Sequence, residues 1–384
     1  MLQRFGKSLF HLKNPIAAEG PNMKVESVSA FPIRVRMKDK LVAGAMVYDD
    51  YMSVLVRVEC DGEVGWGEAM TRFSPLATSE MVGWIAGRVT GETFEGPREA
   101  WSAVWDLYRV RGQTRGIAVE ALSGVETALW DAMGKLRREP VGRMLGKQRS
   151  AELPVYAGSV FGSRGPMGTQ VQRVRDAGLR GFKLKIGFGV EKDVRLARQA
   201  RRMWDDCMLV LDANGAYDAR RANALISRVV DFQPEWLEEP LPSDDFEGYD
   251  LLEREVPLAS GEAWYAGDFA RVFSHRSVDV LEPSVSRCGG VLTDFMVAAR
   301  AEKEGLGFAP MLGVNSGVSL AASLHVASAS ACLAVEYDVF DNPLLTELVT
   351  GLPLPKGGKI KVPTSPGLGI EVDEGFLRSH AVKR

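Results

Sequence analysis

Eight short apolar segments recur at similar spacing after residue 152, and this repeat constrains the fold more than any other feature of the sequence. Their starts fall roughly 22 to 29 residues apart, which leaves room for one helix in each gap, such as the helix-like stretch 191–204. The segments read LPVYAGSV, GFKLKIG, CMLVLDANG, PEWLEEPL, VPLASGEA, VDVLEPSVS, GFAPML and CLAVEYD. Strands that alternate with helices predict an α/β fold, and eight nearly even units favour a closed (β/α) barrel over an open doubly wound sheet.

The chain before this repeat has a different texture and predicts a separate α+β domain, with Asp61-Gly62 as a hairpin turn signal. Strand-like and then helical patterns follow one another at 24–36, 52–60, 64–69, 97–110 and 117–136. We therefore predict a weakly ordered leader (1–22), an α+β domain (23–148), a barrel domain (149–349) and a Pro/Gly-rich segment that returns to the α+β domain (350–384).

Composition argues against several classes of function. The chain has 384 residues, of which 46% are hydrophobic, and a formal net charge of −3, so nothing supports binding to nucleic acid or to a membrane surface. No run approaches the roughly 18 apolar residues of a membrane span. Four widely separated cysteines lack the spacing of zinc ligands, which is typical of reduced thiols in a cytoplasmic protein. They are Cys60, Cys207, Cys288 and Cys332.

Two lysines in the second segment of the repeat, Lys183 and Lys185, are the first indication of function. Residues two apart in a strand point to the same face, so both ammonium groups project the same way. In a barrel, that face points into the packed interior or toward the mouth. Because unpaired buried charge is very costly, the two lysines need anions nearby.

Carboxylates follow the next three segments and can supply those anions. Asp212, Glu238 and Glu262 are 26 and 24 residues apart, one βα unit each, so they converge at the carboxyl end of the barrel, where barrel active sites lie. Three acids this close stay ionised only beside a cation, and their oxygens suit a hard divalent ion. The sequence therefore predicts a Mg²⁺ site.

A divalent ion beside paired lysines suits removal of a proton next to a carboxylate. The resulting enediolate carries its negative charge on two oxygens, which a divalent ion stabilises. We predict that Lys185 is the base, because the neighbouring cations and desolvation favour its neutral amine, and that Lys183 contacts the substrate carboxylate.

With these residues identified, the sequence resembles the mandelate racemase/muconate lactonizing enzyme group of the enolase superfamily. Among its members it is most similar to the sugar-acid dehydratases and the galactarolactone cycloisomerase-like enzymes. The resemblance covers nearly the whole chain from Met23 and rests on several motifs. They read GWGEA, ALSGVETALWDAMGK, KLKIGFGVEKD, LDANGAYD, WLEEPL, SGEAWY, CGGVLTD and PTSPGLGIEVD.

The resemblance implies a modified (β/α)7β TIM-type barrel with an α+β N-terminal capping domain. It implies that Mg²⁺ is held by the three carboxylates named above and that the base position falls on Lys185. It also implies that Glu336 binds the substrate carboxylate and that Asn214 is a polar neighbour of the metal site.

The sequence departs from the pattern of this family at two strand ends. After the sixth barrel strand, racemase-like members have an Asp and muconate-like members a Lys, whereas this chain has Ser284. After the seventh strand no His follows, and the segment reads APMLGVNSG, which contains Asn315. Because the usual second proton acceptor is missing, one-sided chemistry is favoured over two-base racemisation.

Three hypotheses follow. The first is Mg²⁺-dependent dehydration of a sugar acid or related hydroxy acid. The second is cycloisomerisation, racemisation or epimerisation of a sugar acid or lactone through the same enolate. The third is a barrel that keeps its metal site but has lost turnover.

For an enzyme of either kind we expect a small-molecule carboxylate substrate and a homo-oligomer. The stretch 38–51, between the first two predicted strands, is expected to close over the barrel mouth. Tyr48 in that stretch is a candidate substrate contact, as are Ser284 and Asn315 at the departing strand ends.

Overall fold

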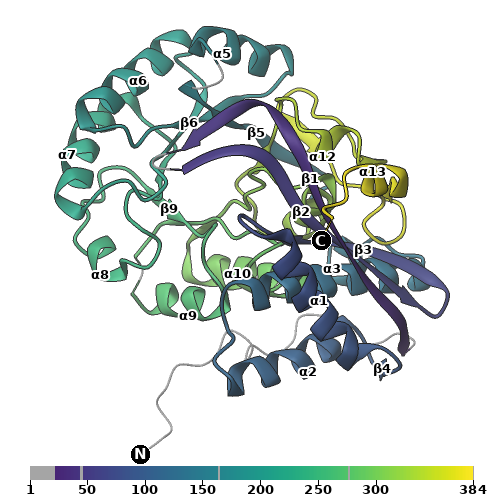
Figure 1. Cartoon of the computed structure of the whole chain (residues 1–384). Coiled ribbons are helices and arrows are strands. Elements are labelled where there is room, and N and C mark those ends of the chain that lie inside the picture. The colour runs from purple at the N-terminus through teal and green to yellow at the C-terminus, as the bar shows by residue number, and fades with distance from the viewer. Residues whose placement is uncertain (1–21, 44–45, 163–164, 276, 384) are drawn as a thin grey trace, which may run out of the picture.

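The computed structural model describes residues 22–43, 46–162, 165–275 and 277–383. Figure 1 shows an antiparallel sheet with helices beside a ring of strands surrounded by helices. The expectation of a weakly ordered leader over 1–22 falls, apart from Asn22, outside the described residues. No helix in the described part of the chain is long and apolar enough to cross a membrane.

The N-terminal part is a four-stranded antiparallel sheet, in the order β3-β2-β1-β4, with three helices. The strands are β1 (Met23–Ala43), β2 (Met46–Cys60), β3 (Glu63–Met70) and β4 (Thr93–Phe94). The helices are α1 (Pro75–Val89), α2 (Pro97–Val110) and α3 (Ile117–Arg137). This α+β unit matches the predicted strand and helix patterns, and Asp61 takes the positive φ of 47° expected in a tight hairpin turn.

The stretch 38–51 differs from the expected connection because it is almost entirely strand. β1 continues to Ala43, and Leu41 pairs with Tyr48 across the hairpin after an irregularity that follows Arg36. Leu41 and Ala43 are buried on one face, which gives this extension an apolar side to pack. In Figure 1 the two purple strands extend across the barrel.

The barrel strands are ordered β11-β10-β9-β8-β7-β6-β5-β12, and every neighbouring pair in this order is parallel. The two ends of this order are joined by a hydrogen bond from the Leu333 N–H to the Phe308 carbonyl oxygen, 2.9 Å long. The predicted α/β barrel is therefore confirmed. The strands are β5 (Glu152–Val160), β6 (Gly181–Lys185), β7 (Met208–Asp212), β8 (Trp236–Glu238), β9 (Leu258–Ser260), β10 (Val280–Leu281), β11 (Gly307–Phe308) and β12 (Val335–Tyr337).

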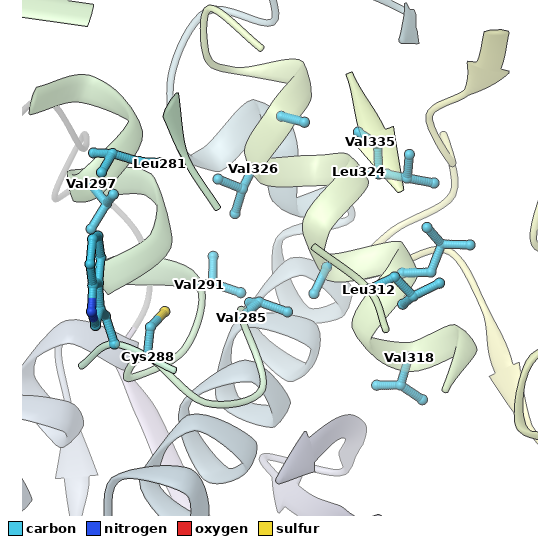
Figure 2. Packing of buried hydrophobic residues seen from close by; sticks show 14 of the residues in the cluster. Leu281, Val285, Cys288, Val291, Val297, Leu312, Val318, Leu324, Val326 and Val335 are labelled. Atoms are coloured by element: carbon cyan, nitrogen blue, oxygen red, sulfur yellow. The ribbon is translucent and has the colours of Figure 1, made fainter. Parts of the chain in front are cut away.

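Helices cover the outside of the barrel. They are α5 (Met167–Asp176), α6 (Val190–Met203), α7 (Ala219–Val229), α8 (Phe246–Tyr249), α9 (Ala266–His275), α10 (Val291–Glu304) and α11 (Gly317–Ser328). Figure 2 shows the buried side chains around α10 and α11, among them Leu281, Val291 and Leu324. A separate small cluster, which includes Tyr156, Trp236 and Ala309, fills the space among the strands.

One close contact holds the strands and helices of the N-terminal domain together, and a second contact fixes this domain to the barrel. A Cβ atom on Gly67 of β3 would lie 2.0 Å from the carbonyl oxygen of Gly124 in α3, so this strand and helix pack directly on each other. The Glu126 carboxylate of α3 accepts hydrogen bonds from the backbone N–H groups of Val291 and Leu292, at 2.7 and 2.9 Å. An acidic side chain of the N-terminal domain thus caps the first turn of a barrel helix.

The C-terminal residues contact both parts of the chain. Strand β14 (Lys359–Lys361) pairs with the start of β5 in the barrel, whereas Ala381 forms a bridge to Ile33 in the N-terminal sheet. The remaining short elements are α4 (Val141–Met144), the 3-10 helix η3 (Val230–Phe232), α12 (Pro343–Thr346), β13 (Val349–Thr350), β15 (Glu371–Val372) and α13 (Glu374–Ser379).

Candidate active site

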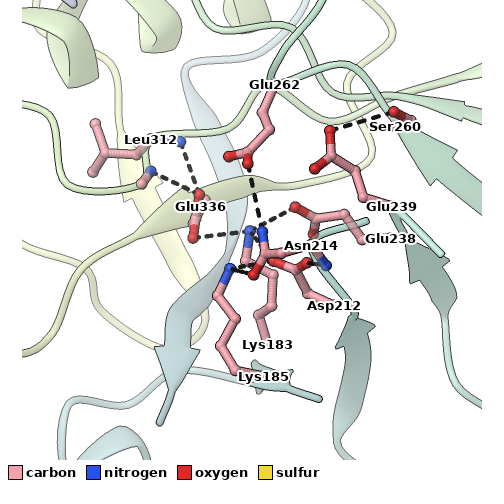
Figure 3. A network of polar contacts seen from close by, with 11 residues as sticks. Lys183, Lys185, Asp212, Asn214, Glu238, Glu239, Ser260, Glu262, Leu312 and Glu336 are labelled. Atoms are coloured by element: carbon pink, nitrogen blue, oxygen red, sulfur yellow. Dashed lines mark hydrogen bonds and ion pairs between the residues drawn. The ribbon is translucent and has the colours of Figure 1, made fainter. Parts of the chain in front are cut away.

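The strand register brings the predicted charged residues to one end of the barrel. Lys185 in β6 pairs with Asp212 in β7, and Asp212 pairs in turn with Glu238 in β8. Glu262 lies two residues beyond the end of β9. Figure 3 shows these side chains converging with Glu336 of β12. The carboxyl ends of consecutive parallel strands therefore form a single charged cluster, as the spacing predicted.

Lys183 is buried at the centre of this cluster, with an exposed fraction of 1%. Its Nζ atom lies 2.9 Å from Glu238 Oε1, 3.2 Å from Glu336 Oε1 and 3.6 Å from Asp212 Oδ2. Burial alone would lower the pKa of Lys183, but the charges of Glu238 and Glu336 hold it well above its usual value. The ammonium form is therefore favoured, which suits a residue that pairs with a carboxylate.

Lys185 points to the same side of β6 as Lys183. Its Nζ atom donates to Asp212 Oδ2 and, at 2.9 Å, to Asn214 Oδ1. Burial lowers the pKa of Lys185, but the charges of Asp212, Glu262 and Glu238 together raise it by more, so the net shift is upward. The neutral amine that the sequence reasoning expected is thus not favoured here, because the Asp212 carboxylate has this lysine as its partner.

Asn214 connects the lysines to the next strand end. It follows β7 in a left-handed backbone conformation, with φ of 46°, which Asn tolerates better than most residues. Its backbone N–H donates to Asp212 Oδ1 at 2.9 Å, and its amide lies 3.5 Å from Glu262 Oε1. Asn214 therefore orients both a predicted metal ligand and the predicted base.

Glu336 accepts two backbone hydrogen bonds, both 2.9 Å long, from the N–H groups of Leu312 and Gly313. Burial raises the pKa of Glu336, but the Lys183 charge and these N–H groups lower it by more, so the carboxylate is favoured. Glu336 thus holds the loop after β11 against the lysine. Its predicted contact with a substrate carboxylate stays a prediction.

The predicted metal ligands are carboxylates, which suit a hard divalent cation. Their present arrangement is less suited to holding one. Within the residues that the structure describes, no three Asp, Glu, His or Cys side chains are placed so that they could hold a metal ion. Instead, Lys183 is hydrogen-bonded to Glu238, and Lys185 is hydrogen-bonded to Asp212, so the two ammonium groups supply the positive charge beside these carboxylates.

One feature of Glu238 does favour a cation. Its Oε2 atom is buried and has no hydrogen-bond partner among the described residues. Burial and the charge of Asp212 also raise the pKa of Glu238 well above its usual value. A divalent ion would satisfy this oxygen and compensate that charge, so Asp212, Glu238 and Glu262 remain the predicted ligand set.

Ser284 and Asn315, at the strand ends that depart from the family pattern, form a neutral network. The Asn315 amide donates to Ser286 Oγ at 3.1 Å and lies 3.5 Å from Ser284 Oγ. All three side chains are buried. A pair of this kind offers no strong base, so one-sided chemistry stays the expectation.

A cavity opens over the lysines, between the barrel and the long hairpin. Its described lining includes Tyr48, Arg72, Lys183, Lys185, Glu262 and Glu336. Tyr48 is therefore near the site, as predicted, whereas Ser284 and Asn315 are not among the described residues that line this cavity.

Sequence reasoning missed two charged residues in this region, Arg72 and Glu282. Arg72 carries no sequence signal, because its position depends on how the N-terminal domain docks. Glu282 follows β10, and both of its carboxylate oxygens are buried without a hydrogen-bond partner in the described part of the chain. The segment VLEP could have revealed it, since it parallels the WLEEP segment that contains Glu238.

Comparison with known families agrees with this geometry. Residues 33–146 match the mandelate racemase / muconate lactonizing enzyme N-terminal domain, and residues 166–376 match the family described as enolase C-terminal domain-like. The chain belongs to the mandelate racemase/muconate lactonizing enzyme group of the enolase superfamily. Members of this group are generally Mg²⁺-dependent, which agrees with the predicted cofactor.

Individual members of the superfamily are similar over almost the full chain. D-galactarolactone cycloisomerase of Agrobacterium fabrum is 30% identical over 92% of this chain and 98% of the relative. Arabinonate dehydratase of Saccharolobus solfataricus is 28% identical over 84% of this chain and 88% of the relative. The crystal structure of an enolase superfamily member from Polaromonas sp. JS666 superposes with a TM-score of 0.86 at 27% identity, over 94% of this chain and 98% of that one.

These relatives support an enzyme of the lyase or isomerase type that acts on carboxylates. They argue against the third hypothesis, a barrel that has lost turnover.

Proposed function

We propose that this enzyme removes the proton α to the carboxylate of a sugar acid and then dehydrates the resulting enolate. The observation that carries the proposal is the buried lysine pair, Lys183 and Lys185, on one face of β6 beside the carboxylates of three further strands. Buried charges in such number are costly to keep for stability alone. They suit a reaction in which charge develops on the substrate.

In this proposal Lys185 accepts the α-proton as the neutral amine, and Asn214 orients its Nζ atom. The C–H electron pair is delocalised onto the substrate carboxylate and then expels the hydroxyl group of the β-carbon. The proton held at Nζ passes to that hydroxyl, so that water leaves and the enol tautomerises to a 2-keto-3-deoxy acid. Lys183 keeps its charge and pairs with the substrate carboxylate.

Asp212, Glu238 and Glu262 would hold the Mg²⁺ ion. When bound, the ion would supply positive charge to the two carboxylate oxygens on which the enolate charge develops.

A second candidate is cycloisomerisation of a sugar lactone by the same base. It is favoured by the similarity to the Agrobacterium fabrum relative and by the neutral Ser284 and Asn315 network, which leaves Lys185 to act alone. In that reaction the ring oxygen of the lactone would leave in place of the hydroxyl. Racemisation is less well supported, because it needs a proton acceptor on each side of the substrate.

Proton exchange tests the proposal directly. The protein is incubated with Mg²⁺ and a library of sugar acids and lactones in D₂O, and NMR follows deuterium at the α-carbon. Semicarbazide detects the 2-keto acid that dehydration forms. We expect Lys185→Gln to slow exchange by about 10²- to 10⁴-fold, the usual contribution of a general base.

Lys303→Gln is the matched control, because Lys303 is an exposed lysine on the outer helix α10. Exchange at the wild-type rate in Lys185→Gln would exclude Lys185 as the base. The absence of exchange with every compound in the library would refute α-proton abstraction as the function.

A further inference from the structure

The cavity over the lysines contains a third cation, Arg72, which comes from the N-terminal domain. Lys183 and Lys185 reach the cavity from strand β6, whereas Arg72 lies two residues beyond β3. Each lysine is already matched by at least one carboxylate within the barrel, as described above. The charge of Arg72 is therefore additional to the charges that the proposed proton transfer uses.

The position of Arg72 is fixed by contacts on both sides of it. The backbone N–H of Met70 donates to the Ser286 carbonyl oxygen in the barrel at 2.9 Å, so the end of β3 is fixed to the loop after β10. The guanidinium carbon of Arg72 lies 5.7 Å from the centre of the Tyr48 ring on the hairpin. A Cβ atom on Gly313 would lie 3.8 Å from Arg72 Nη2, which places the guanidinium beside the loop that Glu336 holds.

Arg72 has no hydrogen bond and no ion pair within the described residues, although it is half-buried. Other arginines near the mouth differ, since Arg115 pairs with Asp268, and Arg287 pairs with Glu120. The Glu120 carboxylate is within electrostatic range of Arg72, but it is engaged by Arg287 and by the Tyr265 hydroxyl. Arg72 thus presents donors to the cavity, and no anion among the described residues receives them.

A guanidinium offers two parallel N–H donors that match the two oxygens of a carboxylate. The reacting carboxylate is already provided for by Lys183 and the proposed metal site. We propose that Arg72 binds a second carboxylate of the substrate, so that the enzyme selects a dicarboxylic sugar acid over a monocarboxylic one. Tyr48 then acts mainly on Arg72, since its ring packs against the guanidinium and orients it. This inference rests on the function proposed above.

The test compares pairs of acids that differ at one carbon. Each pair consists of a hexaric acid and the hexonic acid of the same configuration, such as galactarate and galactonate, which carry a carboxylate or a hydroxymethyl group at carbon six. Deuterium exchange at the α-carbon and initial rates are measured for wild type, Arg72→Gln and Arg72→Lys. Arg111→Gln, an exposed arginine beyond α2, is the control, and thermal melting checks that each variant folds.

We expect the wild type to prefer the hexaric acid. Arg72→Gln should lower kcat/KM for the hexaric acid by about ten- to a hundredfold, mainly through KM, and leave that for the hexonic acid unchanged. Arg72→Lys should restore part of the preference, because it keeps the charge but not the two-donor geometry.

An equal loss for both acids would overturn the inference, and so would no loss for either or a wild-type preference for the hexonic acid. In each of these cases the wild type still exchanges the α-proton, so the proposed function stands. If the wild type exchanges no acid of any pair, the proposed function itself fails, and this inference fails with it.

Discussion

Glu68 of β3 links the N-terminal domain to the barrel, and we expect its substitution to weaken this contact clearly. Its buried carboxylate accepts hydrogen bonds from the Ser316 N–H at 3.0 Å, from the Ser316 and Ser319 hydroxyls at 2.6 and 2.5 Å, and from the Ser53 hydroxyl at 2.7 Å. Ser316 is the N-cap of α11 and follows the loop that carries Gly313. One side chain of the N-terminal domain therefore fixes a barrel helix and, through it, an edge of the active site.

The cost of Glu68→Ala follows from these contacts. A buried backbone N–H left without an acceptor costs about 1 to 3 kcal/mol, whereas hydroxyls can turn toward other acceptors and cost less. Loss of negative charge at the N-terminus of a helix adds about 0.3 to 1 kcal/mol. We expect the free energy of unfolding to fall by about 3 to 5 kcal/mol in total, since a cavity is also left behind. Glu68→Gln keeps one acceptor and should cost only about 1 to 2 kcal/mol.

Urea unfolding followed by circular dichroism measures these differences, and turnover is measured on the folded variants. Glu63→Ala is the matched control, because Glu63 is an exposed glutamate at the start of the same strand. Turnover should fall with Glu68→Ala in conditions where the variant is folded, since Gly313 would no longer be held beside Glu336. Wild-type stability in Glu68→Ala would refute the reasoning, because the contacts would then contribute nothing in solution.

Two further predictions concern pH and metal. Burial holds the pKa of His325 at about 4, below its ordinary 6.5, and the neutral ring accepts from the Gly142 N–H and donates to the Leu368 carbonyl oxygen. Below pH 6.5 only the unfolded chain takes up this proton, so we expect about 3 kcal/mol of stability, present above pH 6.5, to be lost as the pH falls to 4. Urea titrations should show a weaker pH dependence over that range in His325→Gln but not in His275→Gln. We also expect Mg²⁺ at a hundred times its Kd to stabilise the protein by about 2.7 kcal/mol. EDTA should therefore lower the Tm of the wild type but change the Tm of Glu262→Gln little. An equal fall in Tm in both proteins would exclude Glu262 as a ligand.

The barrel and its charged end could be predicted from the sequence because both depend on short-range periodicity. The two-residue period of a strand places Lys183 and Lys185 on one face, and one βα unit separates each carboxylate from the next. The register of β6, β7 and β8 agrees with this reasoning, since it pairs Lys185 with Asp212 and Asp212 with Glu238. Local pattern was sufficient wherever one side chain's position depended only on its own strand.

Positions that depend on how distant segments dock could not be predicted in this way. Tyr48 was expected in a connection, but cross-strand pairing with Leu41 extends the hairpin over the cavity. Arg72 reaches the same cavity only because Met70 is hydrogen-bonded to Ser286, more than two hundred residues later in the chain. No periodicity in the sequence around Arg72 records that contact, so its part in the site was found only from the structure.

The charges of the site explain why the lysines and the carboxylates have to be considered together. Lys183 and Lys185 face Asp212, Glu238 and Glu336, and further buried carboxyl groups, Glu239 and Glu282, lie near them. Burial and neighbouring negative charge raise the pKa values of Glu239 and Glu282 well above the usual range, so protons on these two groups compensate part of the negative charge.

A divalent cation at this end of the barrel would compete both with those protons and with the two ammonium groups. Asp212 is one of the predicted ligands of such an ion and is hydrogen-bonded to Lys185. With the charge of Asp212 compensated, the largest influence that raises the pKa of Lys185 would be removed, and burial would favour the neutral amine. Metal binding and activation of the proposed base would therefore be one event in this site, because both would depend on the same carboxylate.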